Sequence, residues 1–97
     1  MNPQAPESEA TAAGFQGQIP PVEPLLTEVI ATLVLAAGAY LSDESGREPD
    51  MQAAGIAIDV AAAAFERVKE RLRPEERLGI AQMMTETRMA FVKKRGL

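Results

Sequence analysis

The side chains that most often carry chemistry in proteins are missing from this chain of 97 residues. It contains no His and no Cys, which excludes the usual zinc sites, cysteine nucleophiles and histidine acid–base pairs. It also has no glycine-rich phosphate loop and no G-x-S-x-G nucleophile motif. Carboxylate metal sites in helical bundles normally add a Glu-x-x-His element, which this chain cannot supply. We therefore expect no catalytic residue, no metal site, no cofactor and no enzymatic activity.

Arg88 is the residue whose position most suggests a chemical role. Helical periodicity places it within the apolar arc of a helix near the end of the chain. A guanidinium in such an arc needs acceptors, because burying an unpaired charge is very costly. We expect a structural ion pair with Asp59, with Glu28 and Glu66 as the next candidate partners. The alternatives are an arginine that binds an anion or sets specificity and, least favoured, an enzyme built on Arg88 and carboxylates.

The charge distribution argues against a nucleic-acid partner. The net charge is −4, acidic residues dominate the first half of the chain, and Lys93, Lys94 and Arg95 close the second. A DNA-binding domain usually has a pI above about 9 and a basic stripe. Three cations at a helix C-terminus are explained by the helix dipole without any ligand.

The first predicted helix covers residues 24–41 and is apolar on nearly all sides. Thr27, Glu28 and Thr32 are its clearly polar residues. A helix of this kind is buried in a core or sits in a membrane. A membrane span needs about 20 apolar residues, and the predicted helix is shorter. We therefore favour a buried helix and keep membrane insertion as the alternative.

Two further helices are predicted over residues 51–72 and 74–94. Asp50 is a suitable N-cap for the second helix, which has a main apolar stripe and a second apolar patch half a turn away, comprising Ile56, Val60, Ala63 and Ala64. Gly55 and the run Ala61–Ala64 have small side chains, which allow another helix to approach closely. In the third helix, Ile80, Met84 and Phe91 share one arc, and its methionines favour core filling over an open groove.

The segments outside these helices are polar or rich in proline. Residues 1–23 are predicted to be a disordered arm without the basic start and apolar run of a signal peptide; a solubilising tail is favoured over a partner-binding one. The connector 42–49 does not match the ligand spacing of a calcium loop. The expected fold is an all-α three-helix hairpin bundle over residues 24–97.

Several of these motifs together resemble a known family. They are PPVEPLLTEVIATLVLAAGAYL, ESGREPD, QAAGIAIDVAAAAFERVKERL and LRPEERLGIAQMMTETRMAFV. In order and spacing they are similar to the small bacterial proteins of the domain of unknown function 1844 family, over roughly residues 20–94. The resemblance implies a helical bacterial protein with no assigned activity, and it supplies no catalytic residues. At the start of the third helix this chain has Arg73 where the family tends to have a hydroxyl cap.

The amount of apolar helix surface predicts self-association. About 75 foldable residues make a small core that is marginal by itself, and unpaired apolar faces mark interfaces. We expect a homo-oligomer in which the first helix is central, with a candidate interface of Leu26, Ile30, Leu33, Val34 and Ala37. The expected function is a cytoplasmic, non-enzymatic oligomerisation or adaptor module that can have an unknown protein partner. The alternative is a peripheral membrane protein that uses the first helix as an anchor.

Overall fold

The computed structural model describes residues 19–44 and 46–96. They form three long helices, α2 (Val22–Leu41), α3 (Met51–Val68) and α4 (Pro74–Lys94), with a single turn of 3-10 helix, η1 (Lys69–Arg71), after α3. This part of the chain contains no strand, so the predicted all-α fold is confirmed. The predicted arm falls largely on residues 1–18, which lie outside the described residues, and α2 begins two residues before the predicted boundary.

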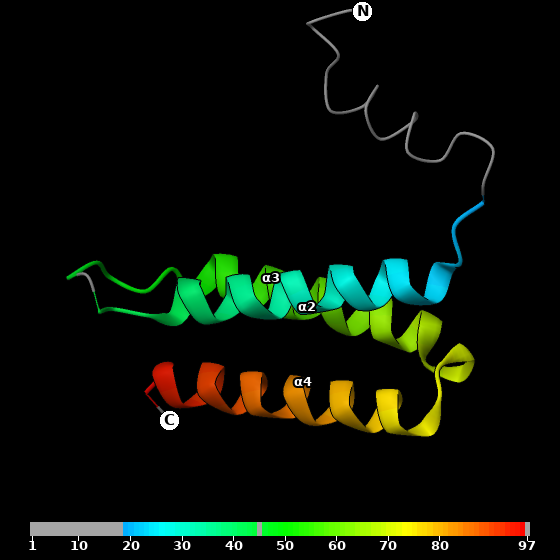
Figure 1. Ribbon diagram of the computed structural model, residues 1–97. Coiled ribbons are helices and arrows are strands. Elements are labelled where there is room, and N and C mark those ends of the chain that lie inside the picture. The colour runs from blue at the N-terminus through cyan, green and yellow to red at the C-terminus, as the bar shows by residue number, and fades with distance from the viewer. Residues whose placement is uncertain (1–18, 45, 97) are drawn as a thin grey trace, which may run out of the picture.

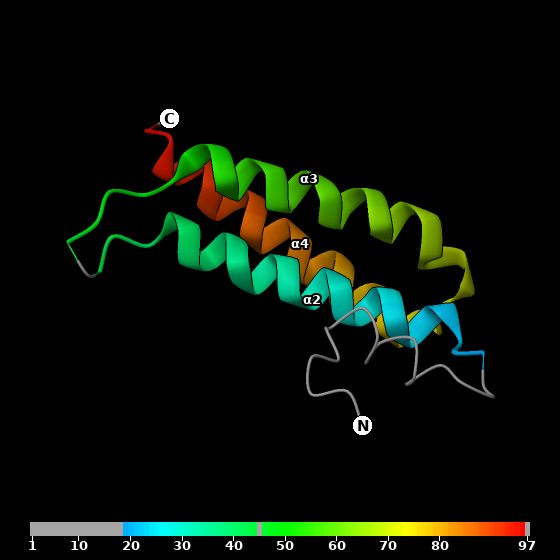
Figure 2. The same ribbon diagram turned by 90° about the horizontal axis from the view of Figure 1, so that it is seen from above.

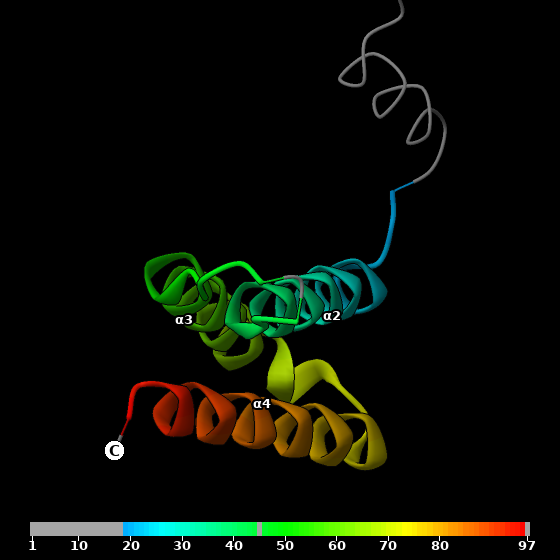
Figure 3. The ribbon, with the colours of Figure 1, turned by 90° about the vertical axis from the view of Figure 1, so that its left-hand side faces the viewer.

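The helices are arranged in two layers. α2 and α3 run antiparallel and lie side by side, and α4 lies across both of them on one side (Figures 1 and 2). An end-on view shows α2 and α3 together in one layer and α4 alone in the other (Figure 3). One side of the α2–α3 layer is therefore covered by α4, and on its other side the described part of the chain places only the short segment 19–21, which leads away from the start of α2 (Figures 1 and 3).

Small side chains let α2 and α3 approach each other closely. Ala37 on α2 and Ala54, Ala57 and Ala61 on α3 are all buried, and Ala37 and Ala57 share one cluster. Towards the other end of the hairpin, the larger Ile30 and Val34 of α2 share a cluster with Val68. The prediction that Gly55 and the run Ala61–Ala64 admit a neighbouring helix holds for Ala61, which is buried, whereas Ala63 of that run is exposed.

α4 is attached to this pair by a narrow apolar stripe. Met84 is its one buried residue among those described, while Ile80 and Met83 are partly buried against the same core cluster. Nearer the C-terminus, Phe91 packs against the cluster of Ala37, Ala57 and Ile58. The prediction that methionines fill the core holds for Met83 and Met84, whereas the side chain of Met89 is 65% exposed.

The helix starts show how local sequence fixes the element boundaries. The side chain of Asp50 accepts a hydrogen bond from the backbone N–H of Ala53 at 3.0 Å, which confirms the predicted N-cap of α3. At the start of α4, Glu76 Oε1 accepts the backbone N–H of Arg73 at 3.1 Å, and Glu76 Oε2 accepts from the Arg73 guanidinium at 3.3 Å. This second arrangement caps the start of α4 although Arg73 carries no hydroxyl group.

Two ion pairs between distant residues hold the ends of the hairpin together. Arg71 of η1 lies 2.9 Å from Glu23 in the first turn of α2. Lys94 at the end of α4 lies 3.2 Å from Asp43 in the connector between α2 and α3. Both pairs are largely exposed, so each contributes little to stability; their positions show which ends of the three helices lie next to one another.

Candidate interaction surface

The predicted ion pair between Arg88 and Asp59 is not formed. Both side chains line the same surface hollow, together with Phe91 and Gly55, yet neither takes part in any of the ion pairs of residues 19–44 and 46–96. Both residues are exposed. The centre of the buried stripe of α4 runs through Met84 and Phe91, which leaves Arg88 at its edge, where the guanidinium reaches water and needs no protein acceptor.

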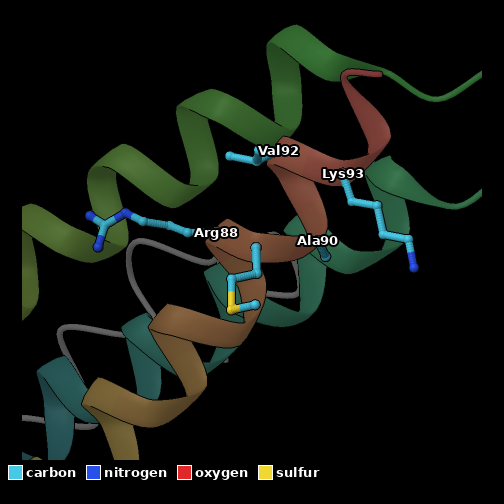
Figure 4. A pocket seen from close by; sticks show the side chains of 5 residues that line it. Arg88, Ala90, Val92 and Lys93 are labelled. Atoms are coloured by element: carbon cyan, nitrogen blue, oxygen red, sulfur yellow. The ribbon is translucent and has the colours of Figure 1, made fainter. Parts of the chain in front are cut away.

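The hollow around Arg88 also lacks the geometry of an anion site. A second, separate hollow beside Arg88 is lined by Arg88, Met89, Ala90, Val92 and Lys93. Arg88 and Lys93 extend in opposite directions from α4 (Figure 4), so their charges do not converge on one point. A site that recognises a phosphate or a carboxylate needs donors directed at the same ligand, and this hollow does not provide them.

The candidate interface predicted on the first helix lies inside the chain. Ile30, Val34 and Ala37 are buried, and Leu26 and Leu33 pack against the same core. The prediction is therefore wrong for Ile30, Val34 and Ala37, which are unavailable to a second molecule in this fold. Leu26 and Leu33 are partly exposed, and Leu33 lines a surface hollow with Leu25 and Val29. A helix that is apolar all round gives no sequence signal for which side packs within the chain.

Four exposed large apolar residues, two on α2 and two on α3, lie on the side of the α2–α3 layer that α4 leaves uncovered, whereas the more exposed Leu35, Leu78 and Met89 lie elsewhere. With 3.6 residues per turn, this side of α2 follows Leu25, Val29 and Ala36, and on α3 it follows Ile56, Val60 and Ala64. We call these six residues the outer face. Leu25 is 44% exposed, Val29 39%, Ile56 57% and Val60 49%. The second apolar patch predicted on α3 supplies half of this face, so the sequence did carry a signal for it.

Charged groups lie at the margins of the outer face. Glu28 is the one charged residue of α2 after its first turn, and on α3 Arg67 continues the line of Ile56 and Val60 towards the C-terminus. Neither residue takes part in an ion pair within the described residues. By contrast, the exposed Leu78, Met89 and Val92 of α4 alternate with charged residues. The outer face therefore brings exposed apolar side chains of two helices next to one another, with Arg67 at its end on α3.

The carboxyl groups with shifted pKa values lie away from the outer face, in the first turns of α2 and α4. Hydrogen bonds from its own backbone N–H and from Arg71 lower the pKa of Glu23 below its ordinary value. The hydrogen bond from the Arg73 guanidinium, followed by that from the Arg73 backbone N–H, lowers the pKa of Glu76, and the same pairing raises the pKa of Arg73. These shifts stabilise the charged forms in ion pairs and do not prepare a group for proton transfer at neutral pH.

Within the part that the structure describes, no group of three or more His, Cys, Asp or Glu side chains is placed to hold a metal ion. Comparisons of the chain with protein-family models, with curated proteins and with solved structures found no match. The resemblance to the domain of unknown function 1844 family therefore stays a prediction.

α2 is longer than the helix predicted from the sequence. It spans 20 residues, and it is apolar enough over that length to cross a membrane, although a core helix or a signal sequence would meet the same criterion. Only 17% of the apolar 18-residue window within it is buried inside the chain. The sequence-based argument held that this helix is too short to span a membrane. It is wrong because α2 starts at Val22, two residues before the predicted start, and so reaches 20 residues.

Proposed function

We propose that this chain is a non-enzymatic helical module that associates with copies of itself through the outer face. The observation that carries the proposal is the exposure of Leu25, Val29, Ile56 and Val60 on the one side of the α2–α3 layer that α4 leaves uncovered. Contiguous exposed apolar patches mark interaction sites on soluble proteins. The proposal includes a cytoplasmic location and an adaptor role in which the assembled module presents its other surfaces to a further protein.

The thin attachment of α4 supports the same proposal. Only Met84 of its described residues is buried, and the two fully buried large side chains in the described part of the chain are Ile30 and Val68. A core of this size leaves little margin over the entropy of ordering the chain. Burying the outer face of one copy against another would add apolar contact at the side of the layer that the helices of a single chain, over residues 19–44 and 46–96, leave exposed.

Sedimentation velocity of a Val60→Glu variant tests this proposal. Val60 is about half exposed, so a glutamate there costs a single chain little, but it places an unpaired carboxylate within the proposed interface. We expect association of this variant to weaken at least tenfold. The matched control is Gln82→Glu, which adds the same charge at an exposed position of α4 and should leave association unchanged. Equal sedimentation of Val60→Glu and the natural chain would contradict the proposal.

A second candidate function is peripheral membrane association through α2. The length and apolar character of α2 favour it, and Leu25 and Val29 would face the lipid. Against it, α2 carries Glu23 and Glu28 and shares its other side with α3. Flotation with vesicles of a phosphatidylcholine and phosphatidylglycerol mixture tests the membrane function. Recovery of the chain with the vesicles, abolished by Val29→Glu, favours it, and recovery in the soluble fraction contradicts it.

A further inference from the structure

We draw no further inference here: the strongest candidate, the apolar outer face that Leu25 and Val29 of α2 form with Ile56 and Val60 of α3, carries nothing beyond the proposed self-association, because nothing in the structure shows what covers it or in which orientation.

Discussion

The ring of Phe91 on α4 packs against the backbone of Gly55 on α3. A Cβ atom added at Gly55 would lie 3.7 Å from the Cε1 and Cζ atoms of that ring, which is ordinary van der Waals distance. This contact closes the C-terminal half of α4 onto the α2–α3 layer, where Ile58 and Ala57 complete the cluster. It determines which side of the layer is covered and, with that, which side is left as the outer face.

Gly55→Ala should stabilise the chain. The added methyl group meets the ring without compression, and alanine is favoured over glycine inside a helix by up to about 1 kcal/mol. Gly38→Ala on α2 is the matched control, because nothing lies within 4 Å of its added Cβ. Urea unfolding should show a gain for Gly55→Ala at least as large as the gain for Gly38→Ala. A loss at position 55 alone would mean that Phe91 lies closer to the helix than described.

Phe91→Ala should release the C-terminal half of α4. Phe91 is partly buried and is the largest side chain that joins this half to α3, so we expect a loss of about 2 kcal/mol, less than the cost for a fully buried phenylalanine. Hydrogen exchange should quicken after Thr87 while the amides around Met84 stay protected. Uniform quickening along the whole of α4 would contradict this division of the helix.

The helices could be predicted from the sequence, whereas the residues of the candidate interaction surface could be predicted only in part. Periodicity and Asp50 gave the three helices, because capping and apolar spacing are local properties. The interface residues could not be placed in the same way: Ile30 and Leu25 are equally apolar, and only tertiary packing turns the first inwards and the second outwards. The prediction of an ion pair for Arg88 failed for a related reason. Helical periodicity places a residue within an apolar stripe, but it does not show where the centre of that stripe lies.

Low pH should remove the contribution of the ion pair at the start of α4. The folded-state pKa of Glu76 is lowered by Arg73, so its contribution to stability is present above the unfolded pKa of about 4.3 and is lost as the pH falls through the lower folded value. Glu76→Gln should therefore have a lower urea midpoint than the natural chain at pH 7, and the difference should shrink towards pH 2. A difference that stays constant across this range would contradict the account.

Arg88→Met should leave the stability of the chain unchanged to within about 0.5 kcal/mol, as for other exposed substitutions. Arg88 is exposed and takes part in none of the ion pairs found in the described part of the chain. The urea midpoint measures this, with Arg88→Lys as the charge-conserving control. If methionine cost more than about 1 kcal/mol and lysine did not, a carboxylate such as Asp59 would have to pair with the arginine in solution.

The mass of the full-length chain in solution, measured by light scattering without detergent over a range of concentrations, tests the central claim most directly. The account predicts a discrete species of twice the 10.4 kDa mass of the chain that dissociates on dilution. A cooperatively folded monomer at every concentration would contradict it, because the outer face would then stay exposed without a second copy to cover it.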